Sequence, residues 1–210
     1  MMKLYYNPLS LNARRAWAPM LHLGLQDQVE LVLVDLGRGE HMTPAFLALN
    51  PNHKVPTLID GDFVLWESIA IALYLAEKTP GQTLWPATAR ERADVMRWIG
   101  WHAIHFGPVV GTFNLEHVIR PLLFKQPTDT AAVAKAEKDL GTFAPVLDQH
   151  LEKRTWLVGD HPTLADFYVA AAFGYEPGSK IPLATYPHIQ AWNRRMLELP
   201  AWAATVPRAG

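Results

Sequence analysis

A β-hairpin that leads directly into a helix is predicted by the stretch Val55-Pro-Thr-Leu-Ile-Asp-Gly-Asp-Phe-Val-Leu-Trp-Glu-Ser68. Its two apolar runs, 55–60 and 63–66, flank a Gly-Asp pair, and Asp-Gly at this point is a strong signal for a tight turn. From Ser68 to Lys78 the apolar residues recur at helical spacing, so an amphipathic helix is expected after the second strand.

The residues before the hairpin predict a parallel βαβ unit. Short β-prone runs at 3–6 and 29–35 are separated by a helical pattern that begins at Ser10 or Asn12. A crossover of this kind places its two strands parallel and is right-handed. A short helix then precedes the hairpin, so residues 1–80 are predicted to follow the order βαβαββα.

Beyond residue 80 the chain changes character. Pro and Gly residues predict a linker at 81–88, and helices are expected near 89–119, 129–153, 163–174 and 187–198. The capping-box pattern from Thr163 to Asp166 marks the start of the third of these helices. The predicted fold is therefore an α/β domain at 1–80, the linker, and an all-helical C-terminal domain at 89–210.

Composition excludes several classes of function. Among 210 residues, 50% are hydrophobic and 19 Lys and Arg face 20 Asp and Glu, so no basic stripe is available for nucleic acid. The absence of cysteine removes disulfides, thiolate metal sites and cysteine nucleophiles. No apolar run approaches the roughly 20 residues of a membrane span, and no signal peptide is predicted, so we expect a cytoplasmic protein without a membrane partner.

A metal centre is not expected either. His102 and His105 are three residues apart on a predicted helix, but no carboxylate accompanies them. Two imidazoles alone make a poor metal site.

Several short motifs follow one another along the chain: Pro8–Arg15, Gly39–His41, Asn50–Pro56, Trp66–Ile71 and Thr163–Asp166. The ordered set resembles the cytosolic glutathione transferases, and the first two motifs resemble the serine-type, phi-like classes. The resemblance implies a thioredoxin-like domain over 1–80 and an enzyme that transfers the sulfur of glutathione to a hydrophobic electrophile. It also implies a homodimer, with glutathione as the co-substrate.

Ser10 is the predicted catalytic residue. It follows the first predicted strand and opens the first helix, where backbone N–H groups favour a negative charge. In the resembling family, a serine at this place donates a hydrogen bond to the glutathione sulfur and favours the thiolate. From the residues alone, Ser10 could be only an N-cap, and Asn12 could be a second donor or the actual cap.

The resemblance assigns the backbone and γ-glutamyl parts of glutathione to two pairs of residues. Val55 and Pro56 match the place where this fold presents a cis-proline, with the Val55 backbone available to pair with the cysteinyl part of glutathione. Glu67 and Ser68 match the groups that hold the ammonium and the carboxylate of the γ-glutamyl end. The alternatives are an ordinary trans-proline beside an edge strand and an ordinary N-cap serine.

The glycyl carboxylate of glutathione requires cations at its other end. The resemblance assigns this role to His41, His53 and Lys54, whereas Met42 stands where the family usually has a lysine. Exposed loop polarity is the alternative explanation for these side chains.

The electrophile pocket is predicted between the loop after the first strand and the first helix of the C-terminal domain. Its expected lining residues are Leu9, Leu11, Met42, Trp101, His105 and Phe113. The aromatic members could instead fill the helical core.

Two other functions remain compatible with the sequence. One is a non-catalytic binding protein with the same fold, although the predicted site residues are all in place. The other is a specialised glutathione-dependent peroxidase or dehalogenase, because the electrophile pocket carries no fixed motif.

Overall fold

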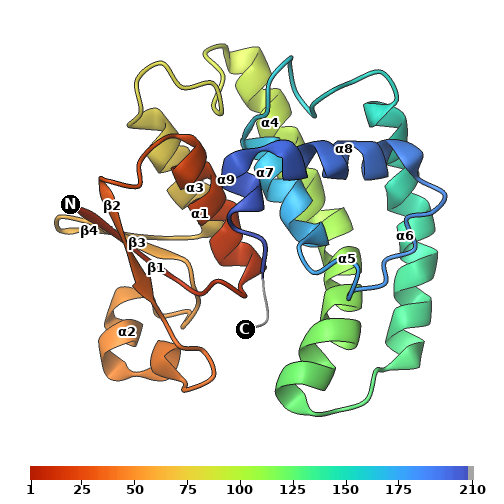
Figure 1. The fold of residues 1–210 in the computed structure, drawn as a ribbon, viewed down its shortest axis with the longest axis horizontal. Coiled ribbons are helices and arrows are strands. Elements are labelled where there is room, and N and C mark those ends of the chain that lie inside the picture. Colours follow the sequence, from red (N-terminus) through yellow and green to blue (C-terminus); the bar gives the residue numbers. More distant parts are fainter. Residues whose placement is uncertain (208–210) are drawn as a thin grey trace. The chain divides into compact units, whose positions relative to one another are not determined.

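Four strands form one mixed sheet in the order β2-β1-β3-β4 in the computed structural model, which describes residues 1–207 (Figure 1). These strands are β1 (Met2–Tyr6), β2 (Val29–Leu33), β3 (Thr57–Asp60) and β4 (Phe63–Trp66). Strand β1 is parallel to β2 and antiparallel to β3, which in turn pairs with β4 in the predicted hairpin. The order βαβαββα and the thioredoxin-like sheet are thus confirmed.

Helices cover both faces of this sheet (Figure 1). On one face, α1 (Leu11–His22) and α3 (Ser68–Glu77) enclose a core that includes Leu4 and Leu58, both fully buried. Because successive strand residues point to opposite faces, Tyr5 packs on the other side, against Phe46 of α2 (Pro44–Leu49).

The end of the chain belongs to this first unit. The chain separates into one compact unit of residues 1–85 with the described residues from Leu199 onward, and a second unit, Pro86–Glu198. Helix α9 (Pro200–Ala203) packs against α1 within the first unit. The predicted C-terminal domain extends to residue 210, and residues 208–210 lie outside the described part of the chain.

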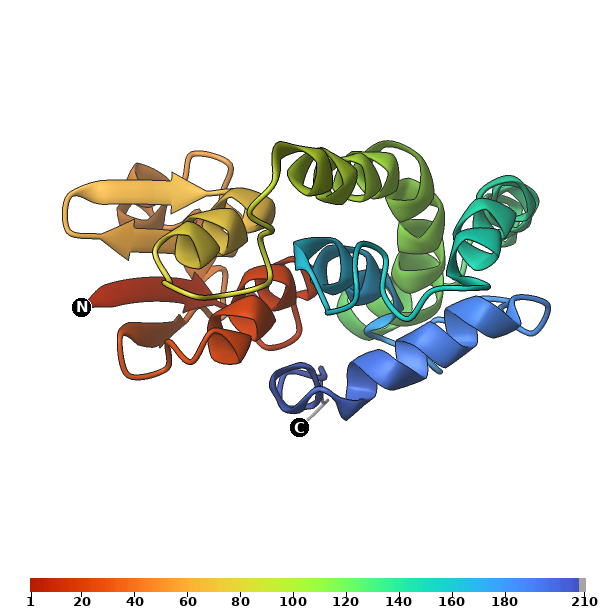
Figure 2. The same cartoon turned by 90° about the horizontal axis from the view of Figure 1, so that it is seen from above.

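The second unit is helical, as expected. Helical turns follow one another in α4 (Ala89–Trp101), α5 (Gly107–Asn114), α6 (Thr130–Leu151), α7 (Leu164–Ala170) and α8 (Pro187–Glu198). In Figure 2, α8 is seen along its length and α6 nearly end-on, so these two helices of the unit run in different directions. The 3-10 turn η4 (Ala171–Phe173) extends α7, so the four predicted helical stretches are all present.

The first of these stretches is not a regular α-helix. It includes two π-helical segments, η2 (His102–Phe106) and η3 (Leu115–Phe124), which flank α5. A Cβ at Gly107 would come within 2.7 Å of the His102 carbonyl oxygen, so the helix needs a glycine where the first wide turn closes. Pro121 lies inside the second segment, where its missing N–H is tolerated by a wider turn.

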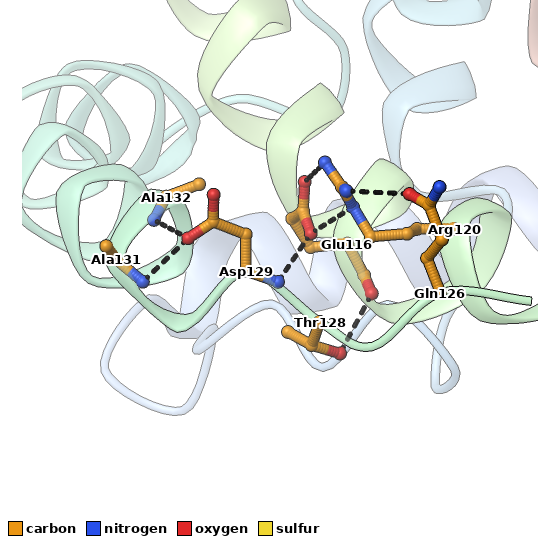
Figure 3. Close-up of polar contacts among 7 residues, drawn as sticks. All are labelled: Glu116, Arg120, Gln126, Thr128, Asp129, Ala131 and Ala132. Carbon is orange, nitrogen blue, oxygen red and sulfur yellow. Dashed lines mark hydrogen bonds and ion pairs between the residues drawn. The ribbon is translucent and has the colours of Figure 1, made fainter. Parts of the chain in front are cut away.

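The buried carboxylate of Glu116 connects the π-helical segment η3 to the start of α6 (Figure 3). Glu116 is 2% exposed, and its carboxylate accepts hydrogen bonds from Arg120 Nη2 at 3.0 Å and from the backbone N–H of Asp129 at 2.8 Å. The hydroxyl of Thr128 donates to the carbonyl of Glu116 at 3.0 Å. The carboxylate therefore pairs with a cation and also fixes the turn before α6.

A second buried carboxylate organises the start of α7. Asp166 Oδ1 accepts from Leu157 N–H and Trp192 Nε1, both at 2.9 Å, and Oδ2 accepts from Thr163 N–H at 2.8 Å. Burial raises the pKa of Asp166 to about 6, while these hydrogen bonds act in the opposite direction. The predicted capping box between Thr163 and Asp166 is confirmed.

Candidate functional site

The register of the sheet gathers the predicted site residues of the first unit at one end. Tyr5 of β1 pairs with Thr57 of β3, and Thr57 pairs with Trp66 of β4. Adjacent strands lie about 4.8 Å apart, so the chain that leaves β1, enters β3 and leaves β4 passes the same end of the sheet. The loops at this end carry Ser10, Val55, Pro56, Glu67 and Ser68.

Ser10 is the N-cap of α1. Its backbone is extended (φ −83°, ψ 114°), and its Oγ accepts a hydrogen bond from Ala13 N–H at 3.1 Å. The hydroxyl donates to no residue among 1–207. Capping uses a lone pair of this oxygen and leaves its proton available, so the cap and donor roles of Ser10 do not exclude each other.

Asn12 lies in the first turn of α1 and is exposed. Its Oδ1 accepts a hydrogen bond from Arg15 Nη1 at 2.7 Å, so the side chain is held along the helix. The alternative in which Asn12 is the actual cap is wrong, because Ser10 occupies that position. Its role as a second donor stays a prediction.

Val55 and Pro56 form a cis peptide bond, as expected. The loop that presents them is fixed from below by Asn50, which is 2% exposed and donates to Lys54 O at 2.8 Å and to Thr57 Oγ1 at 3.1 Å. The side chain of Val55 is buried, but its backbone N–H and C=O pair with no residue in the described chain. An extended ligand could therefore pair with this backbone as an additional strand does.

The start of α3 is open and strained. Glu67 has φ 75° and ψ 118°, a conformation that costs a non-glycine residue about 1–3 kcal/mol. It provides no side-chain cap, and within residues 1–207 the N–H groups of Ser68, Ile69 and Ala70 have no backbone partner. Ser68 is 7% exposed, and its hydroxyl likewise makes no hydrogen bond in that part of the chain. Unpaired N–H groups at a helix start, beside a buried hydroxyl, make a site for an anion.

Two further loops of the first unit carry the residues predicted for the glycyl carboxylate. His41 lies in the 3-10 turn η1 (Glu40–Met42), and its Nδ1 is buried without a hydrogen-bond partner among the described residues. Met42 is 53% exposed. His53 has φ 48°, and His53 and Lys54 are both exposed. Their shared role stays a prediction.

The residues predicted for the electrophile pocket differ in exposure. In the first unit, Leu9 is 43% exposed and Leu11 is half-buried. In the second unit, Trp101 stacks on Phe106 with ring centroids 5.1 Å apart, and His105 is exposed. Phe113 is fully buried, as expected for the alternative in which aromatic residues fill the helical core. The pocket roles of all six residues stay predictions.

Arg14 was not predicted as part of any site, yet it is 2% exposed and binds the end of the chain through Trp202 and Thr205. The sequence did contain a local signal that Arg14 is buried, because it lies four residues before Ala18 on an otherwise apolar side of α1. The partners of Arg14 are nearly 200 residues away in sequence, so that signal could not identify them.

Neither a metal centre nor a membrane span is found in the described part of the chain. Residues 1–207 contain no group of three or more His, Asp or Glu side chains arranged to hold a metal ion. Over the same residues, every helix is too short or too polar to cross a bilayer.

Two family descriptions match the chain. Residues 9–78 match "Glutathione S-transferase, N-terminal domain", and residues 104–200 match "Glutathione S-transferase, C-terminal domain".

Individual relatives span nearly the whole chain. Glutathione S-transferase 3 of Zea mays is 39% identical over 98% of this chain and 93% of its own length. The disulfide-bond oxidoreductase YfcG of Escherichia coli is 32% identical over 85% of this chain and 83% of its own. A theta-class glutathione S-transferase of Xanthomonas axonopodis, solved with glutathione bound, is 31% identical, covers 99% of this chain and 98% of its own, and superposes with a TM-score of 0.86.

Proposed function

The chain belongs to the glutathione transferase superfamily, on its phi-like side, and on that premise we propose that it activates glutathione at one end of its sheet and transfers the sulfur to hydrophobic electrophiles. The observation that carries this proposal is the Ser10 hydroxyl at the N-terminus of α1, the positive end of the helix dipole. Within residues 1–207 this hydroxyl accepts a hydrogen bond but donates none.

Ser10 supplies the activation. An ordinary thiol has a pKa near 8.5, and lowering it by about two units requires roughly 2.7 kcal/mol. A hydroxyl that donates to a charged acceptor contributes about 1.5–3 kcal/mol, and the N-terminus of a helix adds about 0.3–1 kcal/mol. Together these contributions meet the requirement. The thiol proton passes to solvent, and the sulfur lone pair then forms the new bond to the electrophilic carbon while the leaving group departs with its electrons.

The other groups at this end of the sheet hold the rest of the tripeptide. The unpaired backbone of Val55 pairs with the cysteinyl residue, and the open start of α3 accepts the γ-glutamyl carboxylate through Ser68. Glu67 pairs with the ammonium of that group, which explains why a strained residue is retained there. His41, His53 and Lys54 are assigned to the glycyl carboxylate, and the buried unpaired Nδ1 of His41 supports the assignment.

Holding both reactants in this way converts a bimolecular step into a local one. We assign the electrophile to Leu9, Leu11 and Met42 of the first unit, together with Trp101, His105 and Phe113 of the helical unit. A homodimer in the cytoplasm completes the proposal. The likeness to the glutathione transferase family supports the dimer.

The test is Ser10→Ala, compared with Thr88→Ala as a matched control. Thr88 is the N-cap of α4 and accepts from Glu91 N–H, so both variants lose a cap but only one loses the proposed donor. With an aryl halide as the electrophile, Ser10→Ala should shift the pH profile of the conjugation rate upward by about one unit. An unshifted profile in Ser10→Ala would reduce this residue to a helix cap.

Reduction of disulfides by glutathione is a second candidate, favoured by the likeness to the enzyme named a disulfide-bond oxidoreductase. Since the chain has no cysteine, both thiols would have to come from glutathione, whose oxidation balances reduction of the substrate disulfide. A small dialkyl disulfide offered with glutathione, in parallel with the aryl halide, separates the two activities.

A further inference from the structure

Arg14 is almost completely buried in the first unit although it carries a positive charge. Its Nη2 donates to the carbonyl of Trp202 at 2.9 Å and its Nε donates to Thr205 Oγ1 at 3.2 Å. The guanidinium carbon lies 3.6 Å from the centroid of a Trp202 ring. Trp202 and Thr205 are each 1% exposed, so these contacts are shielded from water.

None of these partners is an anion. Among residues 1–207, Arg14 forms no ion pair, and it has no further interaction beyond those contacts and its backbone bonds. Burying a cation without a counter-ion is unfavourable unless its donors are well satisfied. Burial lowers the pKa of Arg14 to about 9, so the guanidinium remains protonated at neutral pH. The C-terminal segment 199–206 therefore supplies the neutral acceptors and the aromatic face that make this burial tolerable.

Arg14 is also part of the first turn that Ser10 caps. Its backbone N–H donates to the carbonyl of Ser10 at 3.0 Å, which is the first helical hydrogen bond of α1. Four residues correspond to about 6 Å along a helix axis. Helix α9 lies beside α1 (Figure 1), so the contacts of Arg14 with the C-terminal segment lie within about one helical turn of Ser10, the proposed thiolate donor.

We propose that Arg14 is a positioning residue, which fixes the Ser10 end of α1 by tying it to the C-terminal segment 199–206. The inference rests on the proposed function, because it gives that segment a part in activating glutathione. It assigns to Trp202 and Thr205 the support of the thiol site through Arg14.

The experiment measures the pKa of the bound glutathione thiol, from thiolate absorbance against pH, together with kcat and KM for glutathione. Arg14→Met should raise that pKa by about half to one unit and lower kcat more than it raises KM. Thr205→Val, which removes one acceptor and little volume, should produce a smaller shift in the same direction. Arg14→Lys keeps one charged donor and should recover part of the loss.

Groups that titrate on neighbouring elements are few. Helix α9 carries none. The titratable groups on the elements around Arg14 are Arg15 and His22 on α1, Lys3, Tyr5 and Tyr6 on β1, and Tyr74 and Glu77 on α3.

Lys3→Met is the matched control, because it removes a cation of the same unit whose ion pair with Glu30 is exposed. It should leave both the thiol pKa and kcat unchanged.

A double-mutant cycle with Ser10→Ala gives the sharpest discrimination. If Arg14 acts through Ser10, Arg14→Met should add almost nothing in the Ser10→Ala background, whereas an additive shift would overturn the inference. If the thiol pKa rises in Ser10→Ala but is unchanged in both Arg14→Met and Thr205→Val, the inference is overturned and the proposed function stands. An unchanged thiol pKa in Ser10→Ala would refute the role of Ser10 and this inference with it. Should Arg14→Met not fold, the same comparisons are made with Thr205→Val.

Discussion

Helices α7 and α3 each have a buried hydroxyl-bearing residue at their start, the N-cap Thr163 of α7 and the first helical residue Ser68 of α3, but their first turns are satisfied in opposite ways. At α7, the Asp166 carboxylate accepts from Leu157 N–H, Thr163 N–H and Trp192 Nε1, and a capping box satisfies the first turn. At α3, the side chain of Glu67 caps nothing, its backbone is strained, and the first N–H groups have no backbone partner in residues 1–207.

The difference between the two helix starts distinguishes a feature that stabilises the fold from one that is suited to bind a ligand. Buried polar groups are normally paired, because each unpaired one costs about 1–3 kcal/mol. A helix start that is closed by its own side chains therefore stabilises the fold, whereas one that is kept open at a strained residue is suited to a ligand. This contrast yields four predictions.

The largest effect is expected from replacing Asp166, whose carboxylate satisfies the donors at the start of α7. Asp166→Ala would leave Leu157 N–H, Thr163 N–H and Trp192 Nε1 unpaired in the core, so the free energy of unfolding should fall by roughly 4 kcal/mol in urea titrations. The control is Asp129→Ala, which removes an exposed cap of α6 and should cost about 1 kcal/mol. Equal losses in the two variants would contradict the contrast.

The second prediction concerns the open start itself. Ser68→Ala should weaken glutathione binding by more than tenfold, because it removes a hydrogen bond to a charged group worth about 1.5–3 kcal/mol. Stability should change little, since the hydroxyl has no partner in the described chain. Isothermal titration with glutathione and urea unfolding measure the two quantities. Unchanged affinity in Ser68→Ala would remove this residue from the site.

A third prediction uses the strain at Glu67. Glu67→Gly relieves the positive φ, so the free energy of unfolding should rise by about 0.5–1 kcal/mol while glutathione affinity falls. Lys125→Gly, at φ 53° in the second unit, should gain similar stability with no change in affinity. A Glu67→Gly variant that loses both stability and affinity would show that the strain is not relieved at this position.

The smallest effect is expected at Met42. Met42→Lys should tighten glutathione binding by about twofold to threefold at low salt, because an exposed ion pair contributes up to about 1 kcal/mol. The gain should disappear in high salt, and Met42→Gln should show none. A gain that persists in both cases would exclude an electrostatic cause.

Local signals predicted most of the fold. The Asp60-Gly61 pair located the hairpin, and Thr163 with Asp166 located α7, because turn and cap residues act on their immediate neighbours. Strand β3 begins at Thr57 rather than at Val55, since Pro56 carries no N–H for a sheet ladder. The family resemblance supplied the site assignments that local patterns left open.

The remaining features depend on tertiary contacts. The π-helical turn at 102–106 is coupled to the close approach of Gly107 to His102, which no helical periodicity encodes. The burial of Phe113 depends on the packing of the whole helical unit. The attachment of α9 to α1 depends on Arg14 meeting a carbonyl and a hydroxyl from the other end of the chain.

The discontinuity of the first unit has a consequence for biosynthesis. Ribosomes add about 5–20 residues per second, so on the order of ten seconds separate the emergence of residue 85 from that of Leu199. During that interval the nascent sheet and α1 exist without the segment that receives Arg14. The unit that is translated first is therefore completed last, and a chain stalled before Leu199 would offer the uncovered side of α1 to chaperones.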